Sequence, residues 1–246
     1  MWTSLPRAGF DTETTGVNVL TDRLVTAAVI IRDGDSEERY TWMADPGVEI
    51  PEYASAVHGI TTERARTEGR PIRDVLEEVA QVLARHMAAG NPVVAYNASF
   101  DFSLLENELA RHGLPTLADR LGGEIFPVID PYFLDRHVDR YRRGKRNLES
   151  IARHYGVPAD ETFHEAEGDV RMTLRVLNKI LEKYPALADA PLDVLMNDQL
   201  AAYNNFMDFI SRKFPRSKDE PRGWPVATLA IEPNDPEDSD GPLTLF

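Results

Sequence analysis

Apolar and polar residues in the first two thirds of the chain follow the repeat of strands in some stretches and of helices in others. Residues 24–32 (LVTAAVIIR) are rich in β-branched side chains and are followed by Asp33-Gly34, a turn dipeptide. Residues 38–43 are therefore predicted to pair with them in a hairpin. Apolar side chains then recur at helical spacing over residues 75–87. A hairpin followed by alternating strands and helices predicts an α/β domain with a mixed sheet.

The same patterns place the other elements of this domain and a C-terminal extension. Strands are predicted within residues 5–12, 92–96 and 125–129, and helices over residues 102–109, 147–155 and 170–180. Residues 191–214 carry a long apolar stripe at helical spacing, and we expect this C-terminal helix, within residues 186–214, to pack on the main domain. Residues 215–246 hold 6 of the 17 prolines and an acidic run, a composition typical of a flexible tail.

Composition and charge exclude several classes of function. The chain has 246 residues, with 41 acidic and 27 basic side chains and a net charge of −14, so a generic basic nucleic-acid binder is not expected. There is no cysteine, which excludes disulfides, zinc–cysteine sites and thiol nucleophiles. Neither a signal peptide nor an apolar run long enough to span a membrane is recognised, so we expect a cytoplasmic protein with no membrane partner.

The first candidate for chemistry is a pair of carboxylates in the first strand. Residues two apart in a strand face the same side, so Asp11 and Glu13 would present two anions at one point. They would repel each other unless a cation lay between them, and oxygen ligands suit Mg²⁺ or Mn²⁺. The alternative is a solvated strand end. An aspartic protease is not indicated, because Glu13 replaces the glycine that usually follows Asp-Thr in such enzymes.

Two further motifs lie where strands or loops lead into helices. In YNASFD, residues 96–101, Asn97 or Ser99 is expected to cap a helix that has Asp101 in its first turn. In HEAEGD, residues 164–169, His164 is expected in a loop and Asp169 near a helix start. Each motif alone is explained by ordinary helix capping or by acidic residues at a helix N-terminus.

Together the three motifs resemble those of the DEDDh family of 3′→5′ exonucleases, within the ribonuclease H-like superfamily. The string FDTETTG and the pattern H-x-A-x-x-D carry the resemblance, which covers residues 9–181. Within the family, the chain most resembles the epsilon-like proofreading exonucleases of bacterial replicative polymerases. In one departure, Tyr96 precedes Asn97 where the family often has histidine. The resemblance implies a mixed five-stranded sheet flanked by helices, within residues 1–185.

The resemblance also implies a two-metal mechanism. Asp11, Glu13, Asp101 and Asp169 would hold two Mg²⁺ or Mn²⁺ ions, and His164 would act as general base on the attacking water. The expected reaction releases nucleoside 5′-monophosphates from single-stranded or frayed DNA 3′ ends in proofreading or repair. The alternatives are an RNA-trimming exoribonuclease and a non-catalytic polymerase or clamp adaptor. The expected contacts with the terminal nucleotide are Thr12, Thr14, His58, Asn97 and Phe100.

Three further segments have a functional and a structural interpretation. Residues 57–61 (VHGIT) resemble a family segment lining the nucleotide pocket, or form a turn in which Thr61 caps a short helix. Six basic side chains gather within residues 136–146, and they either hold substrate phosphates or lie in a solvated loop. Leu243, Leu245 and Phe246 resemble a sliding-clamp docking peptide with Pro242 in place of its glutamine, or are an unstructured end. A DNA polymerase is a further expected partner.

Overall fold

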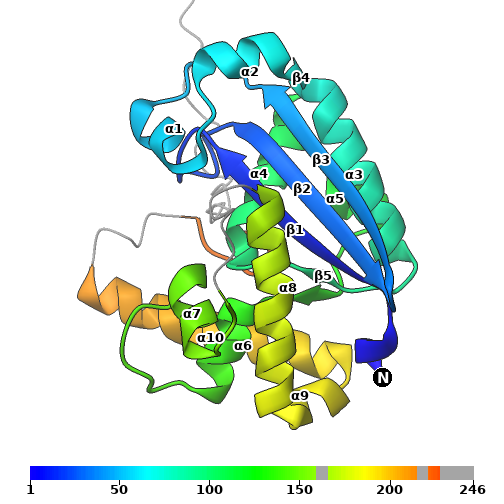
Figure 1. Ribbon diagram of the computed structural model, residues 1–246, viewed down its shortest axis with the longest axis vertical. Coiled ribbons are helices and arrows are strands. Elements are labelled where there is room, and N and C mark those ends of the chain that lie inside the picture. Colours follow the sequence, from blue (N-terminus) through cyan, green and yellow to red (C-terminus); the bar gives the residue numbers. More distant parts are fainter. Residues whose placement is uncertain (159–165, 215–220, 228–246) are drawn as a thin grey trace, which may run out of the picture.

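The computed structural model describes residues 1–158, 166–214 and 221–227, and its centre is a mixed sheet (Figure 1). The strand order is β4-β3-β2-β1-β5-β6. Neighbouring strands in β1–β2–β3 are antiparallel, whereas β5 runs parallel to β1 and β6 parallel to β5. The bounds are β1 Arg7–Thr14, β2 Leu24–Asp33, β3 Ser36–Asp45, β4 Arg70–Pro71, β5 Val93–Val94 and β6 Val128–Ile129.

This sheet confirms the predicted α/β fold and adds a sixth strand. The five predicted strands are all present. The addition, β4, is two residues long and pairs in parallel with the end of β3. Arg70-Pro71 carries no apolar alternation, so the sequence pattern could not indicate it.

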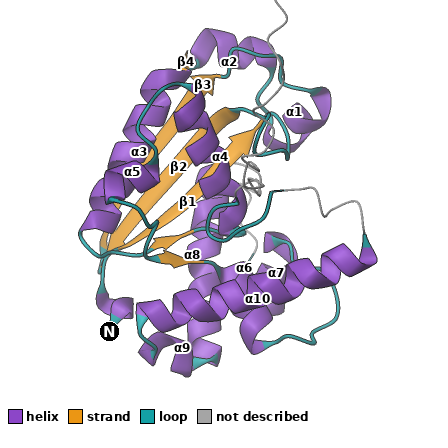
Figure 2. Ribbon diagram, turned by 180° about the vertical axis from the view of Figure 1, so that it is seen from behind, coloured by secondary structure: helices purple, strands orange, loops and turns teal. Residues whose placement is uncertain are grey.

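Helices cover both faces of the sheet. In Figure 1 α8 crosses the near face, and Figure 2 shows α3, α4 and α5 on the opposite face. The helices are α1 Glu52–His58, α2 Thr62–Glu68, α3 Ile72–Ala88, α4 Ala98–Arg111, α5 Leu117–Leu121, α6 Pro131–Val138, α7 Leu148–His154, α8 Ala166–Lys183, α9 Pro185–Asp189 and α10 Leu192–Lys213, and a 3₁₀ turn spans Trp2–Ser4. None of the described helices is long and apolar enough to cross a bilayer.

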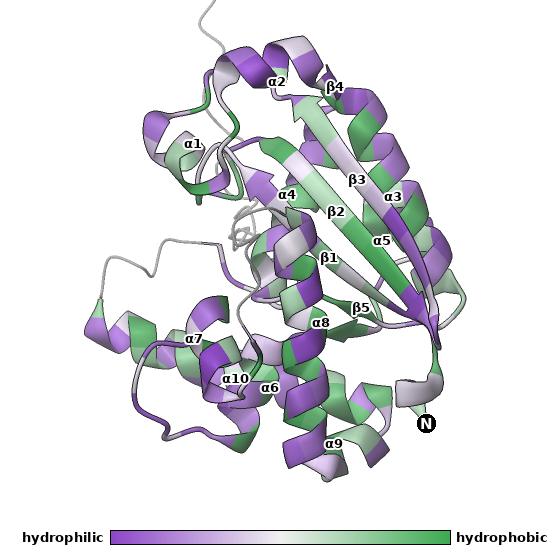
Figure 3. Cartoon of the chain, viewed as in Figure 1, coloured by the Kyte–Doolittle hydropathy of each residue, from purple (hydrophilic) through white to green (hydrophobic). Residues whose placement is uncertain are grey.

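Alternation along β1 sends successive side chains into two different layers. Ala8 and Phe10 belong to the core beneath α3 and α4. Gly9, which faces α8, has no side chain, and a Cβ there would lie 2.5 Å from Val170 Cγ1. This glycine therefore lets α8 pack directly on β1. The central strand β2, buried on both faces, is mainly hydrophobic in Figure 3.

The predicted C-terminal helix is α10, and it packs on α6 and β6. Its buried Gln199 donates to Val128 O at 3.2 Å and accepts from the backbone N–H of Asp130 at 2.5 Å. Part of the predicted tail also packs here: the carbonyl of Gly223 accepts from the Ser99 hydroxyl at 2.7 Å, and Trp224 is 7% exposed. Residues 221–227 are therefore docked against α4 and α10 rather than part of a flexible tail. Burial of the Trp224 side chain stabilises this docking, which the Pro-rich and acidic composition of the tail did not indicate.

Candidate active site

Three carboxylates meet on the face of the sheet that α8 covers. Asp11 and Glu13 are cross-strand partners of Ala28 and Thr26 in β2, and Asp169 lies in the first turn of α8. Carboxylate oxygens of Asp11, Glu13 and Asp169 all lie within 4.8 Å of one another. The alternation of β1 and the close packing of α8 at Gly9 thus bring together residues about 160 positions apart in the sequence.

A fourth carboxylate, Asp101, reaches the cluster from α4. Its Oδ1 accepts hydrogen bonds from the backbone N–H of Thr12 at 3.0 Å and from the Thr12 hydroxyl at 2.7 Å. Asp101 is only 3% exposed. Thr12 lies between Asp11 and Glu13 in β1, so these two bonds hold α4 and its carboxylate beside the cluster.

The electrostatics of the cluster favour a bound cation. Burial, followed by repulsion from Asp101, Asp169 and Glu13, raises the pKa of Asp11 well above its usual range. Burial, followed by repulsion from Asp169 and Asp101, raises the pKa of Glu13 to about 8. Burial also raises the pKa of Asp101 to about 7, although the Thr12 hydrogen bonds oppose this shift.

The donor set fits a divalent metal ion. No basic side chain among the described residues forms an ion pair with Asp11 or Glu13. The available ligands are carboxylate oxygens, which suit Mg²⁺ and Mn²⁺. A metal ion would relieve the repulsion that raises these pKa values. The site is therefore suited to a hard divalent cation.

His164, the predicted general base, lies outside the described residues, and so its role stays a prediction. The described chain stops at residue 158, four residues after α7 ends at His154, and resumes at Ala166, where α8 begins.

His58 lies beside the carboxylates in a cavity of about 420 Å³. It is the last residue of α1, is 7% exposed, and accepts at Nδ1 from the backbone N–H of Ile60 at 3.1 Å. Burial lowers the pKa of His58, which favours the neutral imidazole. The cavity is also lined by Glu13, Thr26, Trp42, Met43, Ile60 and Glu167. Sequence reasoning missed Trp42 and Met43, because their alternation in β3 reads as ordinary core packing.

Both interpretations of residues 57–61 describe part of the structure. Thr61 caps α2 by accepting from the backbone N–H of Arg64 at 3.2 Å, as expected for a capping threonine. Gly59, at φ 73°, ends α1 in the left-handed conformation and turns the chain behind His58. The capping turn therefore also fixes the position of the cavity histidine.

The start of α4 corrects one sequence expectation. Neither Asn97 nor Ser99 caps this helix with its side chain. The buried carboxylate of Asp130 accepts instead from the backbone N–H groups of Asn97 at 3.0 Å and Ala98 at 2.8 Å. Asn97 itself is exposed and has φ 62°. A residue 33 positions away caps the helix, a pairing that local sequence could not reveal.

The remaining predicted contact residues lie near the cluster in different settings. Thr12 is buried and engaged with Asp101, and the Thr14 hydroxyl donates to Gly16 O. Phe100, in the first turn of α4, is partly exposed. Tyr96, which replaces the family's usual histidine, donates its hydroxyl hydrogen bond to Arg146 O. This tyrosine therefore links the second motif to the basic segment.

Comparisons with known proteins agree with this geometry. A family model described as an exonuclease (RNase_T) matches residues 8–177. The PolC-type DNA polymerase III of Streptococcus thermophilus is 30% identical over 170 residues, 68% of this chain and 10% of that protein. The Streptococcus agalactiae counterpart is 29% identical over 199 residues, 80% of this chain and 12% of that protein. The chain spans about a tenth of the length of these curated relatives.

Solved structures show the same fold. Escherichia coli exonuclease I, in a zinc-bound complex with single-stranded DNA, has a TM-score of 0.64 at 19% identity, covering 75% of this chain and 42% of that chain. Exonuclease I of Methylocaldum szegediense has a TM-score of 0.60 at 22% identity, covering 74% of this chain and 41% of that chain. With the family match extending over more than half of its length, the chain belongs to the DEDD-type 3′→5′ exonucleases of the ribonuclease H-like superfamily.

Proposed function

We propose that this exonuclease removes nucleotides from single-stranded or frayed DNA 3′ ends with the help of two Mg²⁺ or Mn²⁺ ions, in replication proofreading or repair. The observation that carries the proposal is the convergence of Asp11, Glu13 and Asp169, with Asp101 held beside them by Thr12. DNA is favoured over RNA because the relatives are named as DNA polymerases and a similar structure is described as a complex with single-stranded DNA.

The four carboxylates would hold the metal ions, and each other residue has a separate task. When bound, such ions would lower the pKa of an attacking water and neutralise charge that develops on the phosphate. Thr12 donates two hydrogen bonds that hold Asp101 in place and oppose the rise of its pKa, which favours the ionised form. His164 would accept the proton of the attacking water. The cavity of His58, Trp42 and Ile60 would enclose the terminal nucleotide and exclude bulk water.

The direct test compares the wild type with Asp11→Asn on 5′-labelled single-stranded DNA in Mg²⁺ or Mn²⁺. We expect a ladder of shortening products and released 5′-monophosphates from the wild type, and none from the variant. A matched RNA oligonucleotide in parallel reactions decides between the two substrates. A folded but inert wild type would instead support the adaptor role.

The clamp and the polymerase are proposed partners. Leu243, Leu245 and Phe246 lie outside the described residues, so their docking is argued from the sequence pattern alone. Deleting residues 243–246 should weaken binding to the sliding clamp and leave turnover of short oligonucleotides unchanged. Unchanged clamp affinity would refute this contact.

A further inference from the structure

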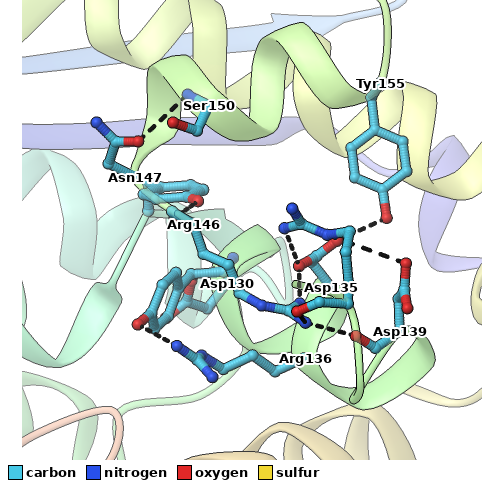
Figure 4. Close-up of polar contacts among 11 residues, drawn as sticks. Asp130, Asp135, Arg136, Asp139, Arg146, Asn147, Ser150 and Tyr155 are labelled. Carbon is cyan, nitrogen blue, oxygen red and sulfur yellow. Dashed lines mark hydrogen bonds and ion pairs between the residues drawn. The ribbon is translucent and has the colours of Figure 1, made fainter. Parts of the chain in front are cut away.

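The basic segment within residues 136–146 divides into internal and outward side chains. Arg142 and Arg146 both bond to the fully buried Asp135, and Figure 4 shows Arg146 beside this carboxylate. The Arg142 Nη2 to Asp135 Oδ2 distance is 3.0 Å, and the Tyr155 hydroxyl donates to Asp135 Oδ1 at 2.8 Å. These contacts shape the loop between α6 and α7, because an unpaired buried carboxylate there would be costly.

Between this loop and α10 lies a groove of about 700 Å³ whose charge is opposite to that of the whole protein. Five arginines line it, namely Arg136, Arg140, Arg142, Arg146 and Arg212. No carboxylate of the described chain belongs to its lining, although the protein has a net charge of −14. Arg140 has no ion-pair partner among the described residues. Arg142 and Arg146 are paired with Asp135, but Arg136 and Arg212, like Arg140, form no ion pair within the described residues. Three unpaired arginines along one groove of so acidic a protein indicate an anionic ligand.

Aromatic rings alternate with these arginines. The Arg136 guanidinium lies 3.7 Å from the centroid of the Phe206 ring. Tyr141 is 86% exposed and Phe209 is 54% exposed, and both line the groove. Exposed aromatic rings beside cations are the means by which proteins bind single strands, since phosphates pair with arginine and bases stack on rings.

The groove is also joined to the catalytic motifs. Arg146 accepts at its carbonyl the hydrogen bond from Tyr96, the residue that opens the second motif. Asp130, which caps α4 next to Tyr96, is also the N-cap of α6 through the backbone N–H of Tyr132 at 2.9 Å. The helix that carries Asp101 and the helix that carries Arg136 therefore start from the same carboxylate.

We propose that this groove holds the substrate strand on the 5′ side of the nucleotide being removed, with arginines on phosphates and Tyr141 and Phe209 against bases. The inference rests on the proposed function, which it deepens by assigning a second, extended contact with the strand. It predicts that the groove improves binding of long strands only, because a dinucleotide held at the carboxylates is too short to use it.

The test uses the full chain with Arg140→Gln/Arg212→Gln and a series of oligo-dT and oligo-U substrates from 2 to 20 nucleotides. We expect KM for the 20-mer to rise about tenfold, with kcat and dinucleotide hydrolysis unchanged. Each lost phosphate contact should lower the slope of log affinity against log salt by about 0.7, so about 1.4 for the pair. Lysine at both positions should restore most of the affinity.

Arg143→Gln is the matched control, since it removes one charge from the same loop at an exposed residue outside the groove lining. An equal effect of this control, an equal effect on the dinucleotide and the 20-mer, or no effect on the 20-mer would overturn the proposal. An unchanged affinity for nucleic acid would favour an acidic protein as the occupant. Anisotropy of labelled dT20, measured in Ca²⁺, tests binding even if the wild type cleaves neither polymer.

Discussion

The carboxylates of the candidate site repel one another because all carry the same charge when ionised. They belong to Asp11, Glu13, Asp101 and Asp169. Burial and repulsion from Asp169 and Asp101 raise the pKa of Glu13 to about 8, and burial raises that of Asp101 to about 7. The unfolded chain gives up these protons near pH 4, whereas the folded protein retains them to higher pH. The metal-free fold therefore binds more protons than the unfolded chain, and its stability falls as the pH rises through this range.

The first prediction is that the metal-free protein loses stability between pH 6 and pH 8. We expect a decrease of at least ~1 kcal/mol, or roughly 2–4 °C in Tm for a domain of this size. Mg²⁺ should raise Tm more at pH 8 than at pH 6, because protons compete with the metal for the same oxygens.

Thermal unfolding in EDTA and in Mg²⁺ measures both effects. Asp11→Asn is the control, since it removes one titrating carboxyl group of the cluster with little change in shape and should flatten the dependence on pH. A wild-type Tm in EDTA that is equal at pH 6 and pH 8 would contradict the prediction.

Thr12 is a positioning residue at this same scale, and Thr12→Val tests it. Valine removes the hydroxyl bond to Asp101 but keeps the backbone N–H bond. We expect a stability loss of about 1–2 kcal/mol and roughly tenfold lower activity, with the acidic limb of the pH–rate profile shifted to higher pH. Thr12→Ser should restore that limb, and an unshifted profile in the valine variant would show a purely structural role.

Asp130 organises the molecule at the scale of its elements. Its carboxylate accepts from backbone N–H groups at the starts of both α4 and α6 and from Trp224 Nε1 at 3.3 Å. Because this one carboxylate accepts hydrogen bonds from several buried donors, it fixes the relative orientation of α4 and α6.

We therefore expect Asp130→Asn to destabilise the fold by about 2–3 kcal/mol, since the amide replaces an acceptor with a donor that faces other donors. Chemical denaturation measures this loss. The affinity of the folded variant for Mg²⁺ should change little, because Asp130 is not part of the carboxylate cluster. A variant as stable as the wild type would contradict this role.

How far the sequence predicts these elements depends on their length. β2, α3, α8 and α10 are long enough for their periodicity to appear, and the structure has each of them within a few residues of its predicted bounds. α7 has only seven residues and is predicted, but α1, α5 and α6, of five to eight residues, are not recognised as helical repeats. Their positions follow from tertiary contacts.

The residue pattern alone predicts the candidate site only where its geometry is local, whereas Asp101 and Asp169 are assigned to the site by the resemblance of the motifs. The placement of Asp11 and Glu13 on one face follows from strand alternation, and the structure shows it. The partnership of Thr12 with Asp101 and that of Asp130 with α4 join residues 89 and 33 positions apart, which no local pattern encodes. Asp130-Pro131 did carry a signal, since aspartate followed by proline is typical of a helix start.

At the scale of the whole molecule, residues 221–227 tie α10 to α4. The Gly223 N–H donates to the Tyr203 hydroxyl at 2.8 Å, and the Ala227 N–H donates to the Ser103 hydroxyl at 2.6 Å. Trp224 is buried in the main core cluster. The segment thus connects α10 to α4, the helix that carries Asp101.

The corresponding prediction compares two truncated chains. A chain of residues 1–227 should unfold within about 1 °C of the full chain, whereas residues 1–214 should lose about 3 kcal/mol, or roughly 6–12 °C, with the buried tryptophan. Differential scanning calorimetry measures both. Trp224→Ala in the full chain should reproduce most of the loss, and equal Tm values for the two truncations would refute the docking.

The docked segment also fixes the point on the protein from which residues 228–246 start. Residue 227 is held against α4, the helix that bears Asp101, so the peptide at 243–246 is tethered to that helix. Sixteen residues of extended polypeptide reach about 55 Å at most. A ring-shaped protein that bound this peptide would therefore have to lie within that distance of α4, the helix that carries Asp101 of the carboxylate site.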